Sequence, residues 1–518
     1  LALRRPWHYR RAPFTALKAL PRRVRGRVPV QYGRTTIGQL PQIVCWPMDG
    51  GAFITLPQVL TLPPGSRNIM ESNLGMYRIQ LSGNAYVPDR EVGMHYQLHR
   101  GIGVHHAAYN QSDEPFRASI FVGGPPAHAF AAIMPLPEGL SELTFAGMLG
   151  GRRFRYKWHR GYVLSADADF VITGIIRKQE KKPEGPFGDH LGYYSLRHDF
   201  PVMEVEEVWH RKDAIWHFTV VGRPPQEDSS FGWLIHELVE PLTPAEFPGI
   251  HEVHAVDEAG VHPLLLAIGS ERYMPFREKK PEELLTQANH LLGKGQTSLA
   301  KYLLIAERTD DPGLHTHDTR AFFRHVLERV DLSRDLHFYT KTTIDTLDYS
   351  GTGWNEGSKL VIAVCGPVRR QLWGALPAGF DLPKGFGNPK LVAPGILAVE
   401  GPAFTYDRGY DEAALLADQL GQRGMEGLPL VVLCDDADFL AADWSNFLWA
   451  AFTRSNPSHD VHGARAQCVH KHWSCAEPLV IDARSKPHHA PPLELDPAVV
   501  RRVEDRFFRK GKPLARWG

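Results

Sequence analysis

The stretch PEELLTQANHLLGKGQTSLAKYLLIA, residues 281–306, marks a change in the kind of secondary structure that the sequence predicts. Pro281 followed by two glutamates is typical of a helix start, and Gly293 of a helix end. The apolar residues between them share one helical face: Leu284, Leu285, Ala288, Leu291 and Leu292. The apolar run 302–306 then predicts a buried strand. It opens an alternation of strands and helices that indicates an α/β domain.

Before this stretch, residues 28–222 consist of short β-rich runs separated by Gly, Pro and Asn. Strands are expected at 118–122, 170–172 and 215–221, and a short helical pattern follows at 234–242. This half of the chain is therefore predicted to be a closed or packed β domain.

After this stretch, the sequence contains a partial repeat. A strand at 303–306 precedes a helix that contains Arg329, and then Asp335; a strand at 430–434 precedes a helix that contains Arg454, and then Asp460. The spacing from Arg to Asp is the same in both copies. Residues 357–359 and 484–486, each containing a Ser-Lys pair, are taken as equivalent.

The length of 518 residues predicts two or three domains. We divide the chain into a basic N-terminal segment (1–28), a β domain (29–228), a linker with a helix (229–295), an α/β domain (296–366) and a C-terminal α/β extension (367–518). A net charge of +1 argues against a nucleic-acid partner. The odd number of cysteines, five, and the absence of a long apolar run favour a protein of the reducing cytoplasm without a transmembrane segment.

Two carboxylates, Glu184 and Asp189, flank Gly185-Pro186-Phe187-Gly188. The glycines allow unusual backbone angles and the proline fixes one, so a tight turn could bring both acids to one point. Paired acids push their pKa values apart, which would leave one protonated as a proton donor. A surface turn with two solvated acids is the alternative.

Further motifs surround this pair in a fixed order. Asn73 and Arg78 lie in NLGMYR (73–78), and the other matches are CWPMD (45–49), MPLPEGLSE (134–142), EGPFGDHLGYY (184–194) and GRPP (222–225). Together, over about residues 27–366, they resemble the UbiD-like decarboxylases, and the C-terminal extension resembles the long members of that family. The resemblance implies a split β-barrel that binds a flavin, followed by an α/β domain. The family's N-terminal α/β segment is mostly missing here, so we expect the chain to begin inside a longer gene product.

The resemblance implies a catalytic set of Arg78, Glu184 and Asp189. Asp189 matches the proton donor, Arg78 would orient the leaving carboxylate, and Glu184 would tune both. The cofactor implied is prenylated FMN, which serves as the electron sink of the reaction.

The same resemblance implies a metal bound by Asn73, His99 and Glu142. This donor set suits Mn²⁺ or Mg²⁺, which would hold the flavin phosphate. A K⁺ ion accompanies it in the family, at a site that the sequence does not locate. Met134 and Arg78 also match cofactor-binding positions. For the phosphate we favour Lys359 over Lys486.

The implied activity is the reversible, non-oxidative decarboxylation of an aromatic or α,β-unsaturated acid. The long form suggests a hydroxynaphthoate of menaquinone synthesis, or a hydroxybenzoate of ubiquinone synthesis. A flavin prenyltransferase would supply the cofactor, and a homo-oligomer (dimer or hexamer) is expected. The alternatives are a metal-dependent hydrolase or lyase without flavin, and a non-catalytic cofactor-binding paralogue.

The motif Cys468-x-His470-x-His472-x-x-Cys475 could also be a zinc site, although its spacing matches no standard one.

Overall fold

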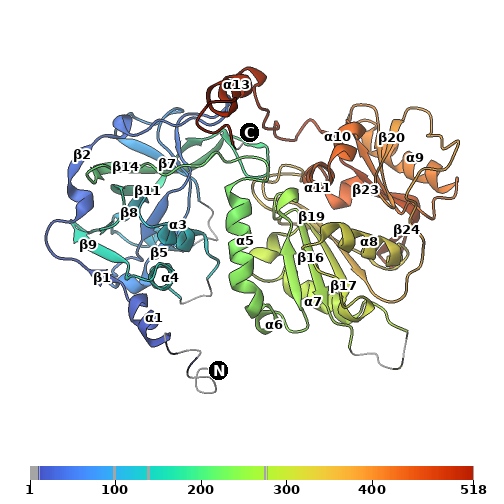
Figure 1. Ribbon diagram of the computed structural model, residues 1–518, viewed down its shortest axis with the longest axis horizontal. Coiled ribbons are helices and arrows are strands. Elements are labelled where there is room, and N and C mark those ends of the chain that lie inside the picture. Colours follow the sequence, from blue (N-terminus) through green and yellow to red (C-terminus); the bar gives the residue numbers. More distant parts are fainter. Residues whose placement is uncertain are drawn as a thin grey trace.

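The computed structural model describes residues 7, 10, 12–96, 101–136, 140–272, 276 and 278–516. Figure 1 shows a β-rich lobe, drawn in blue and teal, beside a larger α/β lobe drawn from green to orange. Helix α5 (Glu227–Val239) stands between them. Helix α13 (Pro497–Val503), near the C-terminus, lies back over the β-rich lobe.

The β-rich lobe contains a nine-stranded antiparallel sheet that curls into an open, split barrel. Side chains of β8 alternate between its two faces, with Ile120 in the core on one side and Phe121 in the core on the other. The curled nine-stranded sheet confirms the predicted split barrel. In sheet order the strands are β3 (Phe53–Ile54), β6 (Ile79–Gln80), β7 (Glu91–Met94), β14 (His198–His210), β11 (Phe170–Glu184), β8 (Phe116–Val122), β4 (Gln58–Thr61) and β5 (Asn73–Gly75), and β2 (Gly33–Thr35) pairs with β14.

Helices cover both faces of this sheet. Helix α2 (Gly101–Asn110) buries Ile102 and Tyr109 in the first core. On the second face lie α3 (Pro126–Ile133), α4 (Glu142–Leu149) and a small sheet of β1 (Arg22–Arg23), β9 (Arg155–His159) and β10 (Tyr162–Ser165). The segment 1–28 thus contributes a strand to the small sheet, and its helix α1 (Ala12–Ala19) contacts α4.

The α/β lobe is built from two five-stranded sheets with the same topology. In each, the three inner strands are parallel and the two edge strands are antiparallel. The first sheet runs β15 (Glu252–Ala255), β16 (Leu264–Gly269), β17 (Tyr302–Glu307), β19 (Gly357–Val364), β18 (Leu336–Thr342). The second runs β20 (Gly387–Ala393), β21 (Ile396–Glu400), β22 (Leu430–Cys434), β24 (His472–Asp482), β23 (Val461–Val469). The predicted repeat is therefore visible in the strand order.

The first sheet begins earlier than predicted. Residues 229–295 were expected to be a linker and one helix, but β15 and β16 lie within them. β16 is buried and pairs with β17, and β15 pairs with β16, so both strands belong to the α/β unit. The segment 215–221, expected to be a strand, joins no sheet. Its backbone instead bonds to side chains, with Trp46 donating to the Val221 carbonyl at 2.7 Å.

The two sheets pack around a shared core. Helices α8 (Thr319–Arg329) and α11 (Trp444–Thr453) lie between them, with Phe322, Phe323, Phe447 and Phe452 buried. The outer faces are covered by α7 (Glu283–Leu292) and α9 (Gly409–Gly421), respectively. The shorter helices are α6 (Thr243–Glu246), α10 (Ala437–Ala442) and α12 (Pro457–Asp460). Of the helices described, none has the length and apolar character needed to cross a bilayer.

Candidate active site

The predicted acid pair lies in a short hairpin at the end of the longest barrel strand. Glu184 is the last residue of β11, and Asp189 follows β12 (Phe187–Gly188), which pairs with β13 (Tyr194–Ser195). Glycine is required where another backbone comes close: a Cβ on Gly50 would lie 2.1 Å from the carbonyl oxygen of Gly185. This hairpin directs both carboxylates to one point.

That point is the guanidinium of Arg78. Its Nε donates to Glu184 Oε1 at 2.8 Å and its Nη2 to Glu184 Oε2 at 2.9 Å, a bidentate pair. Nη1 forms an ion pair with Asp189 Oδ2. The Phe187 ring lies against the cation, with 4.6 Å between the guanidinium carbon and the ring centroid. The side chain of Glu184 is fully buried and that of Arg78 is 8% exposed, so this is a largely desolvated cluster.

Two more side chains complete the cluster. His95 Nδ1 lies 3.1 Å from Glu184 Oε2, and its ring packs against Phe200. Arg78 Nη2 also donates to the Ser195 hydroxyl at 2.8 Å. Every nitrogen of the guanidinium therefore has an acceptor, which fixes the orientation of the cation.

The two acids do not titrate as the sequence suggested. Burial raises the pKa of Glu184, but Arg78 and then His95 hold it well below its ordinary value. Asp189 is also buried, and Arg78 followed by His190 lowers its pKa. Because each acid faces a cation, both are carboxylates near neutral pH, whereas one was expected to be protonated. A proton must therefore reach Asp189 before it can donate one.

Asp49, from the CWPMD motif, ties that motif to the hairpin. Its Oδ2 accepts from the backbone amides of Cys45 and Trp46, and its Oδ1 accepts from Gly188 N at 2.8 Å. A Cβ on Gly188 would lie 2.1 Å from the Trp46 ring. The two motifs thus form one structural unit under the acid pair.

Two of the predicted metal ligands, Asn73 and Glu142, meet at β5, and Met134 lies near that strand. Asn73 begins this strand, and Glu142 Oε2 lies 3.3 Å from the Leu74 amide of the same strand. Met134 directly follows α3, and the carbonyl of nearby Ala132 accepts from Met76 N at 3.0 Å, just beyond β5. The third predicted metal ligand, His99, lies outside the described residues.

Lys359 is placed differently from expectation. Its ammonium donates to the carbonyl oxygens of Ser298 and Ala300, both at 2.9 Å and both in the α/β lobe. The structure therefore does not bring it together with Asn73 and Glu142, and its role toward a phosphate stays a prediction.

Lys486 is not the counterpart of Lys359 in the repeat. His337 pairs with Val361 in the first copy and His462 with Val480 in the second, so Pro478 is the residue equivalent to Lys359. The sequence comparison was wrong here because the hairpin β23–β24 is tight, whereas a long loop joins β18 to β19. Asp335 and Asp460 are true equivalents, since each accepts from the backbone amide four residues earlier.

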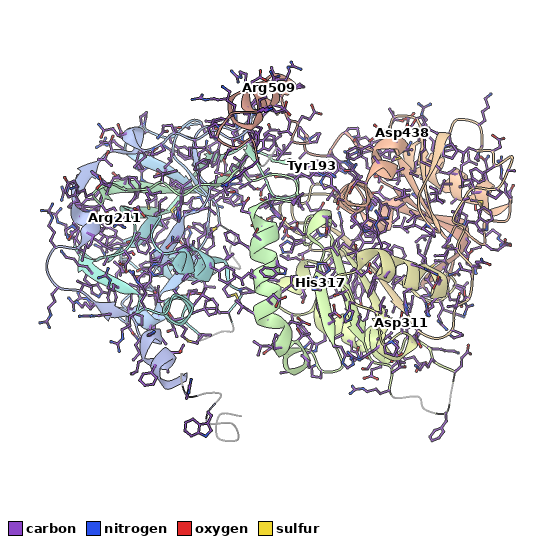
Figure 2. The ribbon with its side chains drawn as sticks, in the orientation of Figure 1. Tyr193, Arg211, Asp311, His317, Asp438 and Arg509 are labelled. Carbon is purple, nitrogen blue, oxygen red and sulfur yellow. The ribbon has the colours of Figure 1, made fainter. Side chains whose placement is uncertain are left out.

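The C-terminal extension contacts the residues that follow Asp189. The Tyr193 ring stacks on Trp449 with 5.0 Å between centroids, and Arg454 Nε donates to the Tyr193 hydroxyl at 3.0 Å. Trp449 donates to the carbonyl of Leu191 at 2.8 Å. Figure 2 shows Tyr193 where the β-rich lobe meets the α/β lobe. The extension is thus part of the support of the site.

Sequence reasoning missed His95, Ser195 and Tyr349 as members of the site. The Tyr349 hydroxyl accepts from Leu196 N at 2.9 Å and lies 3.0 Å from His198 Nε2, so it holds the end of the hairpin from the α/β lobe. No spacing in the sequence indicates this contact.

The possible zinc motif is a hairpin in β23–β24 with Cys468 exposed and Cys475 buried. It is not among the side-chain groups of the described part of the chain that are close enough together to hold a metal ion.

Known proteins resemble this chain over most of its length. The 3-octaprenyl-4-hydroxybenzoate carboxy-lyase Rift-related domain matches residues 22–224, and the C-terminal domain of the same family matches residues 229–364. An uncharacterised protein of Chlamydia trachomatis is 35% identical over 97% of this chain and 83% of its own. A Chlamydia pneumoniae protein, named as one of the subunits of a 4-hydroxybenzoate decarboxylase, is 35% identical over 92% of this chain and 77% of its own.

Solved structures share the fold. The closed form of vanillic acid decarboxylase from Sedimentibacter hydroxybenzoicus has a TM-score of 0.58 at 20% identity, covering 73% of this chain and 79% of that one. The UbiD-class enzyme HmfF from Pelotomaculum thermopropionicum, in complex with FMN, has a TM-score of 0.55 at 20% identity, covering 68% and 76%. The chain therefore belongs to the 3-octaprenyl-4-hydroxybenzoate carboxy-lyase (UbiD) family of decarboxylases.

Proposed function

We propose that this chain decarboxylates an aromatic or α,β-unsaturated carboxylic acid, without net oxidation, with the help of prenylated FMN. The observation that carries the proposal is the buried cluster in which Arg78 holds Glu184 and Asp189 at one point. A guanidinium with this orientation can receive a substrate carboxylate, and a neighbouring acid can protonate the carbon that loses CO₂.

The residues around β5 fit a divalent cation. Burial raises the pKa of Glu142, and no cationic side chain in the described part of the chain offsets that effect. A half-buried carboxylate without a cation is partly desolvated, and a bound ion would offset that cost. Asn73 and Glu142 supply oxygen ligands, which suit Mn²⁺ or Mg²⁺, with His99 as the proposed third ligand. Prenylated FMN, when bound, supplies the electron sink for decarboxylation. A K⁺ ion beside it is part of the same proposal.

The chain's own residues then have distinct roles. Arg78 orients the substrate carboxylate, Glu184 neutralises and fixes Arg78, and Asp189 delivers the proton to carbon. The hydrophobic residues under the cluster, with Phe187 and Phe53 at 4.7 Å between ring centroids, keep water away from it. The substrate we favour is a hydroxynaphthoate of menaquinone synthesis, followed by a hydroxybenzoate of ubiquinone synthesis.

The test is expression together with a flavin prenyltransferase, which is the proposed cofactor supplier. Purified protein should show flavin-like absorption and should release CO₂ from an aromatic acid in a mass-spectrometric screen. Asp189→Asn should abolish turnover and keep the flavin bound. The matched control is Asp438→Asn, at an exposed aspartate of α10 near the top of the α/β lobe (Figure 2), which should change neither. A wild-type protein without bound flavin would refute the proposal.

A further inference from the structure

His190, which follows the proposed proton donor, lies between the two lobes. Its Nδ1 is 3.0 Å from Asp189 Oδ1, and because Asp189 is a carboxylate the imidazole donates this hydrogen bond. The same oxygen also accepts from His190 N at 2.8 Å. The side chain is 16% exposed. His190 is therefore held against Asp189 by two bonds.

On its other side, His190 faces a pair of residues from the α/β lobe. His262 Nδ1 and Asp345 Oδ2 form a hydrogen bond with each other. A nitrogen of His190, a nitrogen of His262 and an oxygen of Asp345 all lie within 4.8 Å of one another. A line of ionisable groups thus leads from Asp189 across the lobe boundary to Asp345 and His262.

The surroundings of His190 are acidic on every side. Five carboxylates face it: Asp189 on its own loop, Glu227 and Asp228 at the start of α5, Asp257, and Asp345. The other ionisable groups nearby are His262 and, beyond Asp189, Arg78. Although burial lowers the pKa of His190, the bond to Asp189 and the neighbouring acids raise it to about 9. His190 is therefore an imidazolium near neutral pH.

Asp189 and Asp345 each form a hydrogen bond with an imidazole, that of His190 and that of His262, respectively, and such a chain of acids and imidazoles is suited to proton transfer. Decarboxylation of a carboxylate consumes one proton for each CO₂ released. In the free protein Asp189 is ionised, so this proton must come from a neighbour. Among the described residues that touch Asp189, His190 is the one that carries a transferable proton at neutral pH, because Arg78 does not deprotonate.

We propose that His190 supplies the proton to Asp189 in each turnover, and that Asp345 of the α/β lobe keeps His190 charged and positioned. The proton leaves His190 Nδ1 for the Asp189 carboxylate, and Asp189 then transfers it to the substrate carbon. The neutral imidazole keeps its proton on Nε2, and Nδ1 regains a proton from solvent water before the next turnover. This assignment rests on the proposed function, since it takes Asp189 as the proton donor.

The decisive variant is Asp345→Asn, which removes a charge without touching Asp189. Its rate profile should keep the wild-type value at low pH, but its alkaline limb should move down by about one pH unit, because the imidazolium loses a stabilising carboxylate. Asp345→Glu, which keeps the carboxylate, should return the alkaline limb most of the way to its wild-type position. His190→Asn should lower turnover by about 10²-fold over the whole pH range. The control His315→Asn, at an exposed histidine beside Glu252, should leave the profile unchanged.

Two results would overturn this assignment. One is an Asp345→Asn rate that drops equally at all pH values, which would mean a merely structural role. The other comes from NMR titration of ¹⁵N-labelled histidines, with His190→Asn to assign the signal: an ordinary pKa for His190, unmoved by Asp345→Asn, would exclude the charge coupling. Because this titration needs neither flavin nor substrate, it separates the two proposals. If no acid is decarboxylated but the titration is as expected, the proposed function fails and the coupling of His190 to Asp345 stands.

Discussion

Removing the Arg78 guanidinium tests how much this one cation contributes to the stability of the folded protein. Arg78→Ala would leave Glu184, which is 0% exposed, and Asp189, which is 10% exposed, without their main counter-charge. Breaking a buried ion pair by deleting one partner typically costs about 3–5 kcal/mol, because the remaining charge stays desolvated. For a domain of this size we expect a melting temperature lower by roughly 6–20 °C. Arg34→Ala is the matched control, since Arg34 pairs with Glu207 but is 56% exposed, and it should cost at most about 1 kcal/mol.

The loss of folding stability in Arg78→Ala should be larger at high pH than at low pH. In the wild type the pKa values of Glu184 and Asp189 are held below their ordinary values, so their stabilisation is present above about pH 4 and is lost as the pH falls through the folded-state values. In Arg78→Ala, burial is the remaining dominant effect and raises the pKa of Glu184 instead. The variant gains stability as that carboxyl protonates, so its deficit should be larger at pH 8 than at pH 5.

Calorimetry and urea unfolding of the cofactor-free protein at pH 5, 7 and 8 would measure this deficit. An Arg78→Ala variant that loses no more stability than Arg34→Ala, or whose deficit grows toward pH 5, would contradict the proposed role of this cation. Arg78→Met, which restores apolar volume but not charge, should recover only the packing part of the loss.

Three further changes have expected outcomes. Glu142→Gln should reduce Mn²⁺ retained after gel filtration by about tenfold or more, as measured by elemental analysis, because it removes a carboxylate ligand; unchanged metal content would exclude Glu142 as a ligand. Trp449→Ala removes the ring stacked on Tyr193 and should cost about 3–5 kcal/mol, visible as faster hydrogen exchange in residues 190–194; unaltered exchange would contradict the supporting role of the extension. Gly188→Ala places a methyl group against Trp46 and should lower turnover even if the protein folds; full activity would show that the hairpin is not tightly positioned.

Much of the fold could be predicted because its signals are local. The strand expected at 430–434 is β22 (Leu430–Cys434), and the run 302–306 lies in β17 (Tyr302–Glu307). Both are continuous apolar runs buried on two faces, which is how inner parallel strands are built. The helix expected after Pro281 is α7, with Leu284, Ala288 and Leu291 fully buried. In contrast, 215–221 has strand-like composition but no strand to pair with, and composition alone does not supply a partner.

The site was predictable where motifs indicate its members: Arg78 was placed with Glu184 and Asp189 by its motif, and the three residues do meet. Glu184 and Asp189 themselves are close in sequence and lie on either side of one turn. The contacts of His190 with Asp345 and of Leu196 with Tyr349 join segments about 150 residues apart. The protonation states depend on such contacts as well: Arg78, His95 and His190 lower the pKa values of the two acids, so neither stays protonated as the sequence suggested. Charge balance at a buried site is a property of the assembled lobes.

The loop 343–350 therefore connects the position of the α/β lobe to the chemistry of the barrel. It carries Asp345, which faces His190, and Tyr349, which binds the amide of Leu196. These two contacts hold opposite ends of the segment 189–196, whose first residue pairs with Arg78 and whose Ser195 accepts from it. Arg78 can contact Asp189 and Ser195 at the same time only while the segment 189–196 keeps this conformation. Docking of the α/β lobe thus fixes both the geometry of the Arg78 cluster and the charge on His190, so lobe position and proton supply are coupled by the same loop.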